Sequence, residues 1–459
     1  MKTFAINTLG CKINQYESQQ MRELLEQLDM RNVEATQKPD LIVINTCCVT
    51  HSASSKSRQS VRRAQRLNPE AQIIVAGCLP TYDTDELGYP GPVIHLIGHQ
   101  QGLLNRLKQI TGKKTSSFQA DNKSTMPRPH VTTKPESTSK LKAKSELVGQ
   151  RQLPSLSSYT GRTRAFLKVQ DGCDGFCSYC IIPSIRTNVS SKEASAVIQE
   201  AQRLVAAGHK EIVLTGIFLG AYGQNTVRRN YWHRCGTDRL AELVVQIAQV
   251  PGLERLRLSS LEPGDLTDAL LDVFCTYQNI APHLHLPLQS GSERILRRMC
   301  RQYTATDYRK TLEKLRLRLD RPAITTDIIV GFPGETQQDF EETVRVAEEA
   351  GFAKMHIFPF SRRRGTAADK IQDQVPQAVI KERSQSLHKL DKQLGRRFRG
   401  QFTGEIARVI VEQTTPARGR CERYYMLQLH GNKTVKIGQF LSARIRGDAL
   451  TADIIESYL

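Results

Sequence analysis

The sequence has no long uninterrupted hydrophobic run. Its start, MKTFAINTLG, holds no apolar stretch of signal-peptide length, and no later segment approaches the length of a membrane span. Acidic residues are few relative to basic ones, since 46 Asp and Glu stand against 65 Lys and Arg and leave a net charge of +19. We therefore expect a cytoplasmic protein with no membrane segment. The excess of positive charge favours a polyanionic partner, with nucleic acid the first candidate, although charge alone does not separate RNA from DNA or anionic lipid.

The cysteines do not form the even set that a disulfide framework needs. Eleven of them indicate thiol and metal chemistry in a reducing compartment. Cys173, Cys177 and Cys180 stand in the segment DGCDGFCSYCIIP, just after a strand-like run at residues 165–169. Three thiolates on one short loop suit a [4Fe–4S] cluster whose fourth iron has no protein ligand. A structural zinc loop is the alternative, but zinc normally takes four protein ligands and this segment has no fourth Cys or His.

The first hundred residues alternate between strand-like and helix-like segments. Apolar runs at 3–7, 41–45, 73–76 and 93–97 are separated by helical stretches such as 15–28 and 52–67. This alternation predicts an α/β fold with a doubly wound parallel sheet. Cys11, Cys47 and Cys78 each follow one of the first three strands, where open α/β sheets bind ligands. We expect these thiols to meet and hold a second cluster, although each one alone would fit a buried core cysteine.

A change of composition separates this first domain from the rest. Residues 111–160 are rich in Ser, Thr, Lys and Pro and have few large apolar side chains. Such a segment buries too little surface to offset its ordering entropy, which predicts a flexible basic linker. The expected organisation is a first domain at 1–110, the linker at 111–160, a central domain at 161–376, a connecting helix at 377–397 and a last domain at 398–459.

The central domain repeats a strand–helix unit six times. Strand candidates lie at residues 165–169, 211–215, 255–259, 283–287, 323–330 and 354–358. Six such units predict a partial (β/α)6 barrel with the cysteine loop at its C-terminal face. One helix is expected to begin at a capping box formed by Ser190 and Glu193 and to end at Gly208. His283 and His285 stand two residues apart on one strand, and we interpret them as barrel lining rather than as metal ligands.

The last sixty residues change to short alternating segments with glycine turns. Strand candidates at 404–411, 424–429, 440–445 and near 454 predict a small OB-like β-barrel, a common platform for nucleic acid. Tyr424 and Tyr425 are candidates for stacking on bases, with half-buried core residues as the alternative.

Taken in order, these segments resemble the radical S-adenosylmethionine (SAM) methylthiotransferase family. The CxxxCxΦC loop is similar to that of the radical SAM superfamily, and the small barrel resembles the TRAM module. TLGCKINQYES, EIVLTGIFLGAYG and ITTDIIVGFPGET resemble the MtaB branch, whose substrate is N6-threonylcarbamoyladenosine in tRNA. The resemblance implies two [4Fe–4S] clusters and SAM as cofactors. It assigns SAM cleavage to the cluster on Cys173, Cys177 and Cys180, and sulfur transfer to an auxiliary cluster on Cys11, Cys47 and Cys78.

The reaction implied by this resemblance is methylthiolation of C2 of N6-threonylcarbamoyladenosine, on the 3′ side of the anticodon, to give the 2-methylthio derivative. Its partners would be the anticodon loop of tRNA, a low-potential electron donor and a sulfur donor of unknown identity. Isopentenyladenosine in tRNA and an aspartate of a ribosomal protein are alternative substrates within the family. A non-catalytic iron–sulfur RNA-binding protein is the alternative from another class.

The resemblance also implies SAM contacts outside the cysteines, at Tyr179, Gly216, Ser260, Glu262 and Gln289, each of which would also fit an ordinary loop residue. This chain departs from many relatives at Phe218, where they carry Asn, and at residues 184–188, where they usually show an Arg-Gly pair followed by Arg-Ser. Cys48 follows Cys47 directly. Because successive side chains at a strand end point in roughly opposite directions, we expect only Cys47 to be a ligand.

Overall fold

The computed structural model describes residues 1–82, 93–95, 153, 155–229, 238–431 and 434–455. Most of the predicted linker, residues 111–160, lies outside this described part. The chain divides into two compact units: residues 1–48 with 53–155, and residues 49–52 with 156–459. Among the described residues, we find no helix whose length and apolar character would let it cross a membrane.

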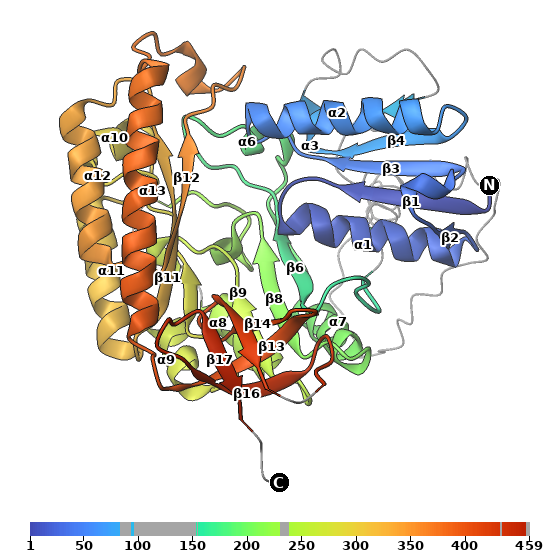
Figure 1. Cartoon of the computed structure of the whole chain (residues 1–459). Helices are drawn as coiled ribbons and strands as arrows, with labels where there is room; N and C mark the ends of the chain where they lie inside the picture. The colour runs from blue at the N-terminus through green and yellow to red at the C-terminus, as the bar shows by residue number, and fades with distance from the viewer. Residues whose placement is uncertain (83–92, 96–152, 154, 230–237, 432–433, 456–459) are drawn as a thin grey trace, which may run out of the picture. The chain divides into compact units, whose positions relative to one another are not determined.

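The first unit is built on a parallel sheet with the strand order β2-β1-β3-β4-β5. Its strands are β1 (Thr3–Thr8), β2 (Arg31–Asn32), β3 (Leu41–Thr46), β4 (Gln72–Gly77) and β5 (Val93–His95), and its helices are α1 (Lys12–Gln27), η1 (Ala35–Gln37), α2 (His51–Leu67) and α3 (Cys78–Tyr82). Alternate residues of a strand face opposite sides of a sheet. Leu41 and Val43 therefore pack with α1 on one face, while Ile42 and Ile44 pack with Val61 of α2 on the other (Figure 1). The predicted doubly wound sheet is confirmed.

The second unit opens with the six predicted parallel strands and one short strand that the sequence did not reveal. They are β6 (Ala165–Asp171), β7 (Ser190–Ser191), β8 (Glu211–Gly216), β9 (Arg255–Leu258), β10 (His283–His285), β11 (Ala323–Val330) and β12 (Lys354–Pro359). They form two sheets, β7-β6-β8-β9 and β10-β11-β12. Isolated bridges join Leu256 to Ile280 and Ser260 to His285, and so continue the strand order from β9 to β10.

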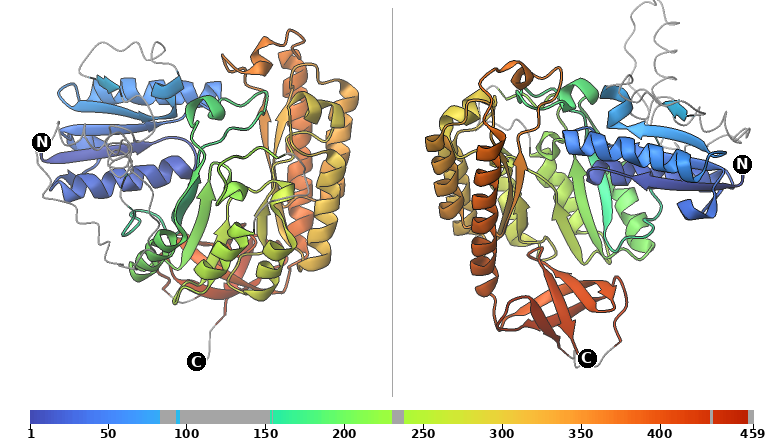
Figure 2. Two further views of the ribbon diagram at one scale, coloured as in Figure 1. Left: turned by 180° about the vertical axis from the view of Figure 1, so that it is seen from behind. Right: turned by 45° about the horizontal axis from the view of Figure 1, so that its top comes forward.

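Helices follow the strands of this partial barrel. They are α6 (Ile182–Ile185), α7 (Ala194–Ala206), η3 (Leu219–Ala221), α8 (Arg239–Ala248), η4 (Pro263–Asp265), α9 (Asp268–Thr276), α10 (Glu293–Arg298), α11 (Ala305–Arg318), α12 (Gln337–Ala350), η5 (Ala367–Lys370) and α13 (Gln377–Gly400). α11, α12 and α13 run side by side next to β11 and β12 (Figures 1 and 2).

The predicted capping box at the start of α7 is wrong. Ser190 and Ser191 form β7, which pairs antiparallel with the end of β6, and the Ser191 hydroxyl oxygen accepts a hydrogen bond from Gly223 N–H at 2.8 Å. α7 begins after Glu193, whose side chain does not cap the helix. The tertiary partners of the serines therefore override the local pattern. Gly208 does follow the end of the helix, with φ +96°, a value that favours glycine.

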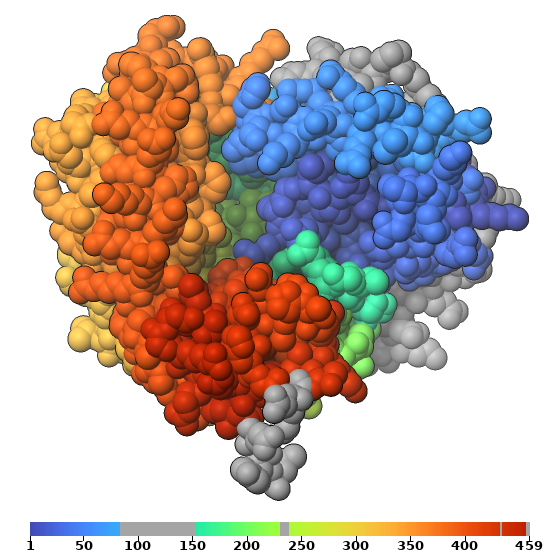
Figure 3. Space-filling model, in the orientation of Figure 1, coloured from blue at the N-terminus to red at the C-terminus, as the bar shows by residue number. Residues whose placement is uncertain are grey.

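The C-terminal residues form a closed β-barrel, as predicted. Its strands are β13 (Ile406–Thr414), β14 (Ala417–Cys421), β15 (Met426–His430), β16 (Phe440–Ile445) and β17 (Thr451–Ile454), in the order β13-β14-β15-β17-β16. β14 was missed because its sequence, ARGRC, is too charged and glycine-rich to suggest a strand. Phe398 and Phe402 pack into the barrel core with Val409 and Leu427, and the barrel (red) adjoins α13 (orange) in Figure 3.

A buried charged cluster joins this β-barrel to the partial (β/α) barrel. The side chain of Glu211 is fully buried and accepts hydrogen bonds from Arg255 at 3.2 Å and Arg257 at 3.1 Å. The same guanidinium groups continue into the small barrel, where Arg255 donates to Arg420 O at 3.3 Å and Arg257 to Glu422 O at 3.1 Å. Although burial opposes it, the nearby arginines hold the pKa of Glu211 below its usual range.

The structure overturns the base-stacking hypothesis for Tyr424. Its ring stacks on His283 with centroids 4.4 Å apart. The guanidinium groups of Arg164, Arg257 and Arg420 lie 5.4, 4.8 and 4.7 Å from its centroid. Tyr424 is therefore part of the junction between the two barrels. The neighbouring Tyr425 packs against the core of the small barrel and is partly buried.

Glu211→Gln should destabilise the chain by about 3–5 kcal/mol, because it leaves two buried guanidinium groups without their carboxylate. The matched control is Glu254→Gln. Glu254 is more exposed and pairs with Lys210 at the surface, so its replacement should cost about 0–1 kcal/mol. Urea unfolding of the full chain, followed by circular dichroism, measures both. Equal, small shifts for the two variants would show that the buried cluster adds no stability.

Candidate metal centres

The loop that carries Cys173, Cys177 and Cys180 begins with a close backbone contact. Gly172, directly after β6, has φ +79°, and a Cβ atom there would lie 1.9 Å from Asn188 O. Only glycine fits this position. Cys173 N–H then donates to Arg186 O at 2.9 Å. The loop is thus anchored to the segment 184–188.

Arg186 also anchors the loop through its side chain. Its guanidinium group donates to Asp171 Oδ1 at 2.8 Å, and Lys168 donates to Asp171 Oδ2 at 2.9 Å. Burial raises the pKa of Asp171, but the two cations outweigh burial and hold it well below its usual range. The carboxylate therefore stays charged and fixes the end of β6 against α6. The altered segment retains a structural role without the Arg-Gly pair.

The far side of the loop is held by residues from α10 and η5. Ser178 N–H donates to Met299 O at 3.0 Å, and its hydroxyl donates to Arg298 O at 2.8 Å. Ser178 O accepts from Ala368 N–H at 2.8 Å. These contacts come from distant parts of the sequence. The position of the cysteine loop is therefore fixed by the fold of the domain.

The three thiols open on one cavity of about 230 Å³. Four of the five predicted SAM contacts line it with the cysteines: Tyr179, Ser260, Glu262 and Gln289. Gln289 has φ +62°, an uncommon value for a residue other than glycine, and its N–H donates to Asp327 O at 2.8 Å. Residues held in such conformations concentrate at ligand sites. The arrangement is therefore that of a binding site.

Gly216 lies at the end of β8 and is not among the residues that line this cavity, whereas the next residue, Ile217, is. A Cβ atom at Gly216 would lie 3.0 Å from the side chain of Gln170. Packing against Gln170 thus explains this glycine without a cofactor. Phe218 does line the cavity. Its backbone N–H donates to Gln170 Oε1 at 2.7 Å, and its ring lies 5.5 Å from the Arg229 guanidinium group.

Arg301 is a residue of this cavity that the sequence analysis missed. It donates to Cys177 Sγ at 3.1 Å and to Tyr179 Oη at 3.4 Å, and it forms a buried ion pair with Glu262. A cation beside a thiolate ligand offsets the negative charge of a cysteine-bound cluster. No spacing in the sequence reveals this contact, because Arg301 and Cys177 are 124 residues apart.

The donor set fits a [4Fe–4S] cluster. Burial raises the pKa of Cys173 to about 11 and that of Cys180 to about 12, so these thiols are protonated at neutral pH until a metal displaces the proton. The cavity has three thiols, one adjacent guanidinium group and no histidine among its lining residues. Cys173, Cys177 and Cys180 would hold the cluster and leave one iron open toward the cavity.

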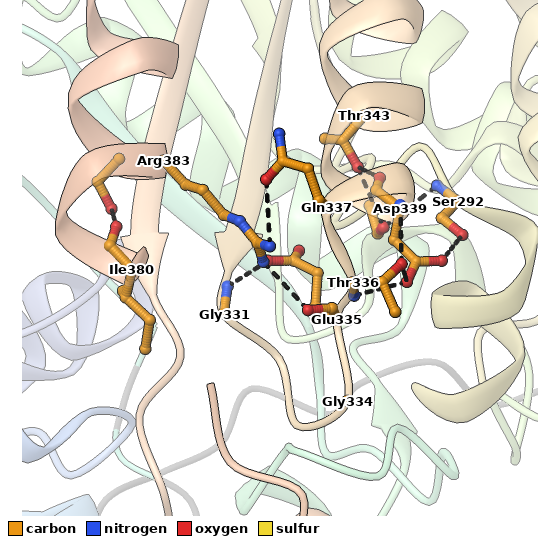
Figure 4. A network of polar contacts seen from close by, with 12 residues as sticks. Ser292, Gly331, Gly334, Glu335, Thr336, Gln337, Asp339, Thr343, Ile380 and Arg383 are labelled. Carbon is orange, nitrogen blue, oxygen red and sulfur yellow. Dashed lines mark hydrogen bonds and ion pairs between the residues drawn. The ribbon is translucent and has the colours of Figure 1, made fainter. Parts of the chain in front are cut away.

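A polar network fixes the loop that contributes Gln289 (Figure 4). Ser292, three residues further on, donates to Asp339 Oδ1 at 2.6 Å near the start of α12. Next to it, the Glu335 carboxylate accepts from Arg383 of α13 at 2.8 Å. Glu335 belongs to the GFPGET motif. The motif's polar residues therefore brace the loops at this end of the barrel and do not line the cavity.

The first unit places Cys11, Cys47 and Cys78 after β1, β3 and β4, which are neighbours in a parallel sheet. Their loops touch one another. A Cβ atom on Gly10 would lie 2.8 Å from Cys47 Cβ and 3.2 Å from Cys47 Sγ, and one on Gly77 would lie 2.4 Å from Thr46 O. The loops therefore approach one another closely at the carboxyl edge of the sheet, as expected.

Asn14 ties two of these loops together and was not found from the sequence. Its side-chain amide donates to Leu9 O and to Thr46 O, each at 2.8 Å. Asn45 in turn donates to Asn14 O at 2.8 Å. Asn14 stands inside the TLGCKINQYES motif and Asn45 in VINTCC. Both act as positioning residues for the cysteine loops, a role that the motifs themselves could have suggested.

Comparison with known proteins agrees with this geometry. The Uncharacterized protein family UPF0004 matches residues 3–98, and the Radical SAM superfamily matches residues 167–347. The radical SAM methyltransferase TsrM from Kitasatospora setae has a similar fold, with a TM-score of 0.51 and 15% identity over 79% of this chain and 73% of that one.

Relatives with known names are similar over nearly the whole length. A threonylcarbamoyladenosine tRNA methylthiotransferase MtaB from Chlamydia pneumoniae is 38% identical over 96% of this chain and 95% of its own. MtaB from Bacillus subtilis (strain 168) is 37% identical over 90% and 85%. A tRNA-2-methylthio-N(6)-dimethylallyladenosine synthase from Thermobifida fusca is 30% identical over 99% and 87%.

The fold, the two cysteine sites and these relatives define a radical SAM enzyme that transfers a sulfur-containing group. The chain belongs to the radical SAM methylthiotransferase family, in which its strongest similarity among these relatives is to the MtaB proteins. The resemblance inferred from the motifs is confirmed, and so are SAM and [4Fe–4S] clusters as the cofactors.

Proposed function

We propose that this enzyme adds a methylthio group to C2 of N6-threonylcarbamoyladenosine, next to the anticodon of tRNA. The observation that carries the proposal is the pair of three-cysteine sites, one at the carboxyl edge of each α/β unit, in a chain whose MtaB relatives are 32–38% identical. The net charge of +19 supports an RNA substrate. A tRNA substrate also supports a cytoplasmic location.

We assign the two sites different roles. Cys173, Cys177 and Cys180 would hold the cluster that cleaves SAM, beside the cavity that Tyr179, Ser260, Glu262 and Gln289 also line. Cys11, Cys47 and Cys78 would hold the auxiliary cluster that carries the sulfur. When bound, the clusters and SAM supply the radical chemistry that replaces the hydrogen on C2, an aromatic carbon that has no leaving group.

The protein's own residues prepare these sites. Arg301 and Glu262 place a balanced pair of charges in the wall of the cavity. Tyr179 packs with Met299 and Phe332 and so closes the apolar side of the loop. The partners proposed beyond tRNA are a low-potential electron donor and a sulfur donor.

Deletion of the gene should leave tRNA with N6-threonylcarbamoyladenosine and remove its 2-methylthio derivative. Mass spectrometry of digested tRNA from the deletion strain and from the parent strain measures both nucleosides. Complementation with the intact chain should restore the derivative, whereas a Cys173→Ala, Cys177→Ala, Cys180→Ala triple variant should not.

Three other outcomes would contradict this assignment. Loss of 2-methylthio-isopentenyladenosine would move the substrate to the one named in the Thermobifida fusca relative. Loss of a methylthio group from a ribosomal protein would show that the substrate is a protein and not tRNA. An unchanged nucleoside and protein profile, together with no SAM cleavage by reconstituted protein, would favour a non-catalytic iron–sulfur RNA-binding protein.

A further inference from the structure

Three side chains with metal-binding donor atoms gather on the sheet β10-β11-β12. His285, Asp327 and His356 each offer one donor atom, and these atoms all lie within 4.8 Å of one another. Asp327 and His356 are direct partners in the register of β11 and β12, which run side by side (Figure 1). His285 pairs with Thr325, two residues before Asp327 and therefore on the same face. The register of three strands creates the cluster.

The His285 ring is oriented by a second polar group. Its Nδ1 lies 2.9 Å from Thr325 Oγ1, which is also 3.2 Å from His283 Nε2. When the Thr325 hydroxyl donates to His283, it accepts from Nδ1–H of His285. In that tautomer Nε2 is the ring nitrogen left to bind a metal, and it lies 3.3 Å from Asp327 Oδ2. Histidines that bind metals usually donate their other ring N–H in this way.

We propose that His285, Asp327 and His356 form a binding site for a divalent first-row metal ion, with Zn²⁺ the best match. Two imidazole nitrogens and one carboxylate oxygen are a common zinc set, and three protein ligands leave a fourth position open. This revises the interpretation of His285 as barrel lining alone. The site was invisible in the sequence because its members are 42 and 29 residues apart along the chain.

A lysine beside the site does not occupy its carboxylate. Lys354 stands on the same strand face as His356, but its ammonium group is paired with Asp391 of α13. Lys354 therefore does not compete with a metal ion for Asp327.

The chain leads directly from this site to the cavity beside the cysteine loop. His285 is the last residue of β10, and Pro287 and Gln289, two and four residues further on, line that cavity. Asp327 is partly exposed to solvent and His356 is exposed. An oxygen of the modified base, such as its carboxylate, is the class of ligand that the fourth position would take. This role of the ion rests on the function proposed above.

Zinc binding by the holoenzyme tests the site without any turnover. Reconstituted protein, washed with chelator and then titrated with Zn²⁺ against a fluorescent chelator, should take up one ion per chain. His356→Ala and Asp327→Asn should each lose this ion, and Thr325→Val should weaken its binding about 10–100-fold. His388→Ala, which changes an exposed histidine of α13, is the matched control and should bind normally. Iron content, measured in parallel, should not change in any variant.

X-ray absorption at the zinc edge identifies the ligands. Nitrogen and oxygen neighbours at about 2.0–2.2 Å support the site, whereas sulfur at about 2.3 Å would place the ion on cysteines and overturn it. Equal zinc uptake by wild type and His356→Ala would overturn it as well. The role toward substrate is measured separately. Zinc-free wild type and His356→Ala should show the same rise in KM for tRNA relative to the zinc-loaded wild type. An unchanged KM would show that the ion has a structural role and does not bind the substrate.

Discussion

Cys47→Ala should lose about half of the iron of the reconstituted protein, because it removes one of the three ligands proposed for the auxiliary cluster. It should still cleave SAM, since Cys173, Cys177 and Cys180 belong to the other compact unit. Iron analysis and release of 5′-deoxyadenosine measure the two effects on one preparation. Conversion of tRNA should fall to background, because the sulfur-carrying site is gone while radical formation remains.

The matched control for this prediction is the adjacent residue. Cys48→Ala should keep the iron, the SAM cleavage and the tRNA product. A Cβ atom built on Gly10 would lie 3.2 Å from Cys47 Sγ, so the Cys47 thiol is the one that faces the loop of Cys11. Cys48 is fully buried, so its replacement removes only a small apolar group from the core. Loss of iron from Cys48→Ala together with normal iron in Cys47→Ala would reverse the assignment.

Periodicity and spacing were enough to predict the architecture. The runs that became β1, β3, β4 and the six barrel strands are apolar, regularly spaced and separated by helical segments, so local pattern and tertiary structure agree. The pattern failed where tertiary contacts decide. The sequence around Ser190 predicts a helix cap, but Ser190 pairs with β6. The charged sequence of β14 does not suggest a strand, but this segment pairs with β13 in the closed barrel. Short segments of this kind have too few residues for a period to emerge.

The candidate cysteines could be found in the sequence because thiols at metal-ligand spacing are rare. The residues that support them could not be found in this way. Arg301 reaches Cys177 from another βα unit, and the pairing of Asp327 with His356 depends on the register of β11 and β12. A one-residue shift in register would turn those side chains to opposite faces. For Tyr424 the sequence left base stacking and a half-buried core position as alternatives, and its stacking on His283 in the structure favours the second.

Arg301→Met should lower the reduction potential of the cluster on the Cys173 loop. The guanidinium group donates to Cys177 Sγ and carries a buried positive charge, and both favour the more negative, reduced state of a cluster. A fall of about 60 mV corresponds to a tenfold change in a one-electron equilibrium. Potentiometric titration followed by electron paramagnetic resonance measures it. The Cys47→Ala background leaves a single cluster to titrate.

Two further variants separate this electronic role from a structural one. Arg309→Met removes an arginine that pairs with Glu349 at the surface, so it should change neither potential nor stability. Arg301→Met with Glu262→Gln removes both members of the buried pair and should recover much of the stability that Arg301→Met loses, because no uncompensated charge remains. The potential should stay low in this double variant, since the donor to Cys177 is still missing. If the potential instead returned with the stability, Arg301 would act on the cluster by neutralising the negative charge of Glu262, and its hydrogen bond to Cys177 would contribute little.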